Sequence, residues 1–150
     1  MPERTPSQTV GPFFSIGLCR ERQTELVPGG SVRLVGRVLD GAGDPVPDAV
    51  VELWQRGADG TLWGRCGTDA AGSFEFRTET PVDGYANVLL FARGLLKHLV
   101  TRCYVAKRSD EVLGALGPRE RETLIAKEDN GALRFDIHLQ GERQTVFFDV

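Results

Sequence analysis

Turn residues return at short intervals along this chain, and their spacing sets the strictest limit on its fold. Stretches such as 40–48 (DGAGDPVPD) and 69–73 (DAAGS) separate short apolar runs. Within a run such as 133–139, apolar and polar side chains alternate with the period of two that places them on opposite faces of a strand. The chain has 18 glycines and 8 prolines among 150 residues, so it is rich in turns without being low-complexity. The pattern predicts many short strands and not disorder.

The apolar runs define the expected elements. We expect strands over 32–39, 49–55, 62–67, 74–79, 87–93, 95–105, 123–127, 133–139 and 145–150. Asn130-Gly131 is the strongest hairpin signal and should join the strands on either side of it. Short helical turns are expected at 110–116, with Asp110 as N-cap, and from Pro118 onward. Eight or nine short strands predict an all-β chain folded as an antiparallel β-sandwich, with one or two short helical turns.

The first thirty residues differ from the rest of the chain. Prolines and the pair Gly29-Gly30 interrupt them, and they show little periodicity. A frayed terminus would explain this, but the segment carries too many apolar side chains for a free tail: Val10, Phe13, Phe14, Ile16 and Leu18. We expect residues 1–30 to form an extended N-terminal arm that docks on its own body or on a partner. Residues 31–150 should form one β-sandwich domain.

Charge and composition argue against several classes of protein. Eighteen basic and twenty-one acidic residues give a net charge of −3, which disfavours nucleic-acid and anionic-membrane binding. The cysteines, Cys19, Cys66 and Cys103, are odd in number and form no C-x-x-C pair, which disfavours a disulfide framework or a zinc ribbon. The start of the chain has no apolar leader, and the longest apolar run, 88–92, is too short to span a bilayer. A soluble, reduced, cytoplasmic protein is the expectation.

Few side chains suggest chemistry by themselves. The two histidines, His98 and His138, lack nearby catalytic partners in sequence and are expected to be solvated or hydrogen-bonded. Trp54 and Trp63 are expected to serve packing. Arg93 is different, because it stands in FARG at the end of an apolar run. It can be a salt-bridged strand end or a planar clamp for a carboxylate, and both readings stay open.

Several segments, taken together and in order, resemble intradiol aromatic-ring dioxygenases. They are TPSQTVGPFF (5–14), VELWQ (51–55), GRCGTD (64–69), FARG (91–94), TLIA (123–126) and RFDIHLQGERQTVFFDV (134–150). The resemblance covers most of the chain and is strongest to the α chains of members that cleave protocatechuate, a catechol carboxylic acid. It implies the two-sheet fold expected above.

The same resemblance implies that the metal lies elsewhere. In this family two tyrosinates and two histidines hold Fe(III), and the histidines form an H-x-H on one strand. Here Tyr85 and Asn87 stand at the H-x-H positions, and the shortened loops 56–64 and 78–84 contain no tyrosine. The resemblance therefore implies that this chain holds no metal and that a related β subunit carries Fe(III). The αβ hetero-oligomer would convert protocatechuate and O₂ to 3-carboxy-cis,cis-muconate.

The resemblance also implies substrate-binding residues, although none in this chain is expected to be catalytic. The arm, around Thr9, Gly11, Pro12 and Phe13, would lie against the active site of the β subunit. Arg93 would lie near the substrate carboxylate and supply charge and bidentate geometry. Gly11 would let the backbone approach the ring closely, and Pro12 would stiffen the arm.

Two other interpretations remain open at this point. The chain could be a transthyretin-like β-sandwich that binds or scaffolds without any catalytic assembly. It could also be a homo-oligomeric enzyme with an unusual metal site built from Tyr85, Tyr104, His98 and His138. Retention of GPFF and FARG favours the dioxygenase interpretation, because a scaffold has no need of them.

Overall fold

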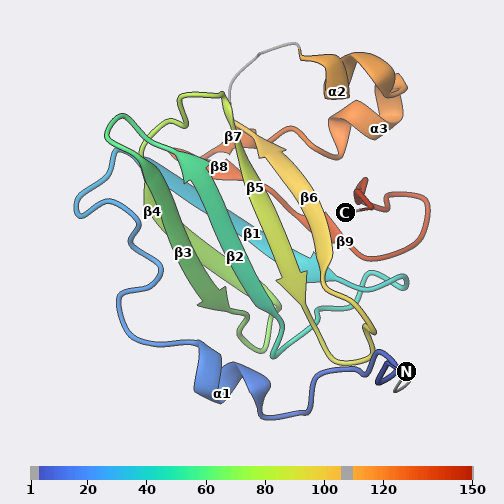
Figure 1. Ribbon diagram of the computed structural model, residues 1–150. Coiled ribbons are helices and arrows are strands. Elements are labelled where there is room, and N and C mark those ends of the chain that lie inside the picture. The colour runs from blue at the N-terminus through green and yellow to red at the C-terminus, as the bar shows by residue number, and fades with distance from the viewer. Residues whose placement is uncertain (1–3, 106–109, 150) are drawn as a thin grey trace.

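The computed structural model describes residues 4–105 and 110–149. Two β-sheets pack face to face, and short helices lie at their ends (Figure 1). One sheet has the strand order β4-β1-β8-β7, with β9 also paired to β1, and the other has the order β3-β2-β5-β6. The strands are β1 (Val32–Leu39), β2 (Val50–Arg56), β3 (Thr61–Gly67), β4 (Ser73–Thr78), β5 (Tyr85–Phe91), β6 (Leu99–Tyr104), β7 (Lys127–Asp129), β8 (Ala132–Arg134) and β9 (Ile137–His138). The predicted β-sandwich is confirmed.

Alternating side chains on strands such as β4 and β5 fill the space between the sheets. On β5, for example, Ala86, Val88 and Leu90 are buried in the core, while the side chains between them face outward. The core is lined from the other sheet by Leu34, Phe76 and their neighbours. This division leaves the outer face of the four-stranded sheet free to carry polar and aromatic side chains.

The run 133–139 was expected as one strand, and the structure divides it into β8 and β9. Both pair with β1 in parallel, whereas the other strand pairs are antiparallel. The reason lies at Arg37, whose backbone N–H donates to the Asp136 carboxylate at 3.0 Å. The Asp136 carboxylate thus accepts the hydrogen bond that a backbone carbonyl would accept in a regular ladder. The pairing with β1 is therefore interrupted between β8 and β9.

The Asn130-Gly131 hairpin is confirmed. Both residues have left-handed backbones, with φ of 49° and 78°, as a two-residue type I′ turn requires. The strand before the turn is the short β7, and not 123–127 as expected. Residues 124–126 instead exchange backbone hydrogen bonds with Tyr104 at the edge of β6.

The last predicted strand, 145–150, is not formed as such; its final residue, Val150, lies outside the described residues. The Thr145 N–H donates to the His138 carbonyl in one sheet, and the Phe148 N–H donates to the Val100 carbonyl in the other. The segment therefore lies between two strand edges and has too few successive partners on either to make a ladder. It closes one side of the sandwich.

The root of the N-terminal arm closes the opposite side. The Gln23 carbonyl accepts from the Arg65 N–H of β3, and the Thr24 carbonyl accepts from the Arg77 N–H of β4. The Arg77 carbonyl in turn accepts from the Leu26 N–H, and the Leu26 side chain packs against the core. The arm is thus joined to the edges of both sheets.

Three five-residue helices complete the described parts of the chain. The two expected ones are present: α2 (Glu111–Ala115), capped by the Asp110 carboxylate, and α3 (Pro118–Glu122). The third, α1 (Phe14–Leu18), lies within the arm where an extended conformation was expected. Over residues 4–105 and 110–149, no helix has the length and apolar character needed to cross a membrane.

Candidate functional site

The arm crosses one end of the sandwich and meets the turn after β5. The backbone N–H of Gly94 donates to the Thr9 hydroxyl at 2.7 Å. Gly94 has a φ of +86°, a left-handed conformation that glycine adopts without strain, and it directly follows Arg93. Two of the sequence-predicted site residues, Thr9 and Arg93, are therefore brought to the same turn.

Arg93 forms an ion pair with Asp48. A guanidinium nitrogen lies 2.8 Å from a carboxylate oxygen, and 54% of the Arg93 side chain is exposed. The salt-bridged strand end is thus present in the structure. A half-exposed guanidinium has a fork of five donors, so it can hold Asp48 and still meet a second carboxylate that arrives from outside.

The remaining predicted residues, Gly11, Pro12 and Phe13, form the turn that starts α1. The Phe14 N–H donates to the Gly11 carbonyl at 3.3 Å, and Phe13 has φ and ψ of −105° and 10°. These are the features of a type I turn with proline in its preferred position. This turn continues into α1, which explains why the arm is helical there.

This part of the arm faces outward. The exposed fractions of Phe13 and Ile16 are 74% and 75%. Apart from its two chain neighbours, no described residue would have an atom within 4 Å of a Cβ built on Gly11, so contacts among the described residues do not require glycine there. Large exposed apolar side chains on a segment held at its end are typical of an interaction surface.

A hollow of about 440 Å³ lies beside the Thr9–Gly94 contact. Gln8 and Val10 of the arm line it on one side, and Phe91 and His98 line another, with their rings 5.4 Å apart. The C-terminal segment contributes Phe147 and Phe148. The arm, the end of β5 and the C-terminal segment thus meet at one place.

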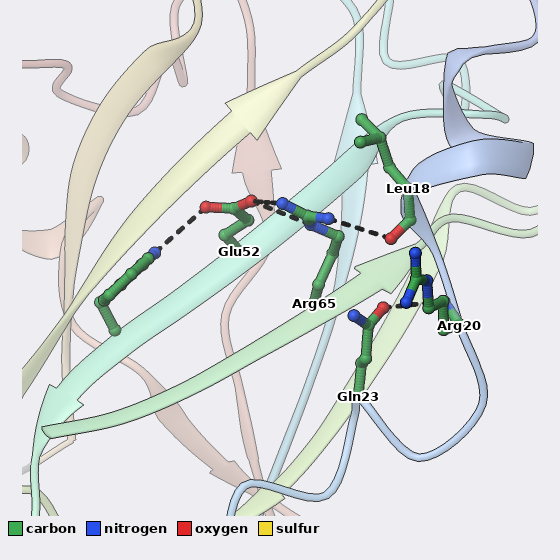
Figure 2. A network of polar contacts seen from close by, with 6 residues as sticks. Leu18, Arg20, Gln23, Glu52 and Arg65 are labelled. Carbon is green, nitrogen blue, oxygen red and sulfur yellow. Dashed lines mark hydrogen bonds and ion pairs between the residues drawn. The ribbon is translucent and has the colours of Figure 1, made fainter.

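A second group of residues, which the sequence alone did not single out, holds the other end of α1 (Figure 2). Glu52 of β2 and Arg65 of β3 face each other in register on the outer face of the sheet. The Nε and a terminal nitrogen of Arg65 donate to one Glu52 oxygen, with Nε at 2.9 Å. The other terminal nitrogen donates to the Leu18 carbonyl at 3.0 Å.

Both tryptophans belong to this group. The Trp54 indole N–H donates to the second Glu52 oxygen at 3.1 Å, and the Arg65 guanidinium lies 5.0 Å from the centre of the Trp63 ring. The expected packing role is therefore combined with a polar one. Glu52 and Arg65 occur in the VELWQ and GRCGTD segments, but the charges could be paired only once the β2–β3 register was known.

The residues present do not fit a ferric site at the H-x-H positions. Tyr85 and Tyr104 are paired across β5 and β6, with ring centres 5.3 Å apart. The Arg102 guanidinium lies 4.3 Å from the centre of the Tyr85 ring, and the Tyr104 hydroxyl donates to Asp110 at 2.8 Å. The positive charge of Arg102 beside the two phenols opposes the binding of Fe(III) there. Burial also raises the pKa of Tyr104, which disfavours the phenolate that Fe(III) would need.

The histidines do not join the two tyrosines. His98 lies in the connection after β5, and His138 lies on β9 in the other sheet. Burial lowers the pKa of His138, with a smaller contribution from the positive charge of Arg143. Among the described residues, no group of three or more histidine, cysteine, aspartate or glutamate side chains is arranged to hold a metal ion. His98 lies at the opposite end of the β5–β6 pair from Tyr85 and Tyr104, and His138 lies in the other sheet, so this chain does not bring the four residues together.

The arrangement of the two sheets is that of the intradiol dioxygenases. One similar structure is the dioxygenase domain of a dioxygenase and carbohydrate-binding protein fusion from Streptomyces sp. SirexAA-E. It matches with a TM-score of 0.61 and 23% identity, over 93% of this chain and 99% of that one. At this identity the likeness concerns the fold alone.

The sequence comparison is more specific. The chain is 35% identical to the protocatechuate 3,4-dioxygenase alpha chain of Burkholderia cepacia, over 99% of this chain and 98% of the relative. It is 37% identical to the protocatechuate 3,4-dioxygenase alpha chain of Pseudomonas putida, over 99% of this chain and 97% of that relative. This chain belongs to the family of protocatechuate 3,4-dioxygenase alpha chains. No protein-family model matches it.

Proposed function

We propose that this chain is the non-iron α subunit of a protocatechuate 3,4-dioxygenase. It would assemble with a related β subunit that carries Fe(III), and the hetero-oligomer would cleave protocatechuate with O₂ to 3-carboxy-cis,cis-muconate. Membership of the alpha-chain family supports this assignment. The misfit of Tyr85, Arg102 and Tyr104 to a ferric site supports placing the iron in the partner.

The contribution of this chain is binding and orientation. The ring-opening chemistry belongs to the Fe(III) of the partner, and no residue here is assigned a catalytic step. Thr9, Gly11, Pro12 and Phe13 would lie against the partner's active site, and Arg93 would meet the substrate carboxylate. The observation that carries this proposal is the hydrogen bond from Gly94 to Thr9, which supports a common site for the arm and Arg93.

The organisation and location of the protein are part of the proposal. Residues 1–30 would act as the arm and residues 31–150 as the sandwich domain. The exposed Phe13 and Ile16 support a partner contact through the arm. We place the assembly in the cytoplasm, where the reduced state of three cysteines without a disulfide framework is expected.

The role of Arg93 can be tested in an enzyme reconstituted with a β subunit. Arg93→Met should raise KM for protocatechuate by about 10-fold to 100-fold, because hydrogen bonds to charged groups contribute about 1.5–3 kcal/mol. The control is Arg33→Met, which breaks an exposed ion pair with Glu75 on the other sheet. An unchanged KM in Arg93→Met would show that this arginine does not bind the carboxylate. A chain that neither binds a β subunit nor supports activity would favour the scaffolding interpretation.

A further inference from the structure

The segment from Thr9 to Leu18, here called the strap, is held at both ends. Thr9 accepts from Gly94 at one end, and the Leu18 carbonyl accepts from Arg65 at the other. Between these anchors the strap exposes Phe13 and Ile16. No residue of the strap is buried, so packing restrains it little and its shape depends on the anchors.

The Arg65 anchor is an ion pair between a buried carboxylate and a half-buried guanidinium. The side chain of Glu52 is 7% exposed and that of Arg65 is 20% exposed. A buried ion pair seldom adds net stability over apolar residues of similar size, because both charges lose their hydration. What this pair provides is geometry, since Glu52 accepts two of the guanidinium donors and leaves a third directed at Leu18 (Figure 2).

The second carboxylate oxygen of Glu52 also has a hydrogen-bond partner. The Trp54 indole N–H fixes that oxygen, and the Trp63 ring covers one face of the guanidinium. Each partner of the pair is therefore restrained by a second group. Rotation of Arg65 away from Leu18 would cost contacts with both Glu52 and Trp63.

We propose that Arg65, oriented by Glu52, is a positioning residue that fixes the strap for its contact with the partner's active site. This inference rests on the proposed function for the role of the strap, whereas the anchoring itself can be measured in this chain alone. A lysine could keep the charge but not the fork of donors that bridges Glu52 and Leu18.

The first measurement is the backbone order of the full chain by ¹⁵N relaxation. In the wild type, the order parameters of the strap amides should approach the value of about 0.85 typical of a rigid backbone. In Arg65→Met they should fall below about 0.6, while those of β5 and β6 stay unchanged. Arg65→Lys should give intermediate values. Arg33→Met, the same change at an exposed pair, should leave the strap as it is.

Removing Arg65 alone leaves Glu52 buried and unpaired, which can prevent folding. The double variant Glu52→Gln/Arg65→Met avoids this problem, because it leaves no unpaired charge and keeps an acceptor for Trp54 while it removes the donor to Leu18. It should loosen the strap in the same way. An unchanged strap in this variant, or equal loosening of the strap and the strands, would overturn the proposal.

The second measurement uses the enzyme reconstituted with a β subunit. The double variant should raise KM for protocatechuate about fivefold or more, with kcat changed by less than about twofold, because the strap must be ordered again on binding. A loosened strap with unchanged KM would overturn the positioning role. If the wild-type chain gives no active complex, the proposed function fails instead, and the relaxation data still decide whether Arg65 anchors the strap.

Discussion

Replacing Gly64 by alanine should displace the root of the arm from β3. A Cβ at this buried position would lie 2.3 Å from a methyl carbon of Leu26 and 2.7 Å from the Gln23 carbonyl oxygen. Ordinary contact begins at about 3.4 Å, so the methyl would have to retreat by about 1.1 Å and the carbonyl by about 0.7 Å. The methyl can rotate away, but the carbonyl belongs to the backbone.

The magnitude follows from what these atoms do. The Gln23 carbonyl accepts from the Arg65 N–H at 2.9 Å, and its retreat would stretch that hydrogen bond beyond useful length. Overpacking costs about 1–3 kcal/mol and a lost hydrogen bond about 0.5–1.5 kcal/mol. We expect the free energy of unfolding to fall by about 2–3 kcal/mol. For a chain of this size, the melting temperature should fall by about 4–12 °C.

Urea unfolding followed by circular dichroism would measure this loss. The matched control is Gly114→Ala, because a Cβ added to the exposed Gly114 of α2 would meet no atom of the described residues within 4 Å, apart from its chain neighbours and the backbone of its own helix. Alanine there should stabilise the protein by up to about 1 kcal/mol, since it is the better helix former. A Gly64→Ala protein within about 0.5 kcal/mol of wild type would refute the close approach of the arm.

Two further changes test the polar groups of the fold. Tyr104→Phe should lower the free energy of unfolding by about 1–2 kcal/mol in urea titrations, because the hydroxyl donates to Asp110 and accepts from Arg102. Tyr85→Phe is the control. An equal loss in the control would show that these two hydrogen bonds are not the cause. Burial lowers the pKa of His138 in the folded protein. As the pH drops through the ordinary histidine pKa of about 6.5, the unfolded chain therefore binds more protons than the folded protein, and the free energy of unfolding falls. His138→Gln should reduce this loss between about pH 7.5 and 5.5, and an identical pH dependence would show that another group is responsible.

The parts of the fold that could be predicted are those set by local sequence. Asn130-Gly131 dictates its turn because few other residues adopt two left-handed conformations in succession. Asp110 caps α2 through a contact only three residues away. The division of 133–139 could not be predicted, since it depends on the Asp136 carboxylate reaching Arg37 in a distant strand.

The candidate site follows the same rule. Thr9 and Arg93 could be named from sequence segments that resemble a family, but their meeting at Gly94 is a long-range contact. Arg65 and Glu52 could not be paired without the register of β2 and β3. The helix within the arm was missed because Phe14–Leu18 is too short and too apolar for a periodic signal.

The parallel pairing of β1 has a consequence for synthesis of the chain. Leu34 pairs with Leu133, and Val38 pairs with Ile137, so one of the first strands made must wait for some of the last. Until residues 132–138 leave the ribosome, one edge of β1 has open backbone donors and acceptors beside an incomplete core. Long-range pairing of this kind slows folding and exposes nascent chains to aggregation. We therefore expect the yield in a cell to depend on chaperones more than the final stability would suggest.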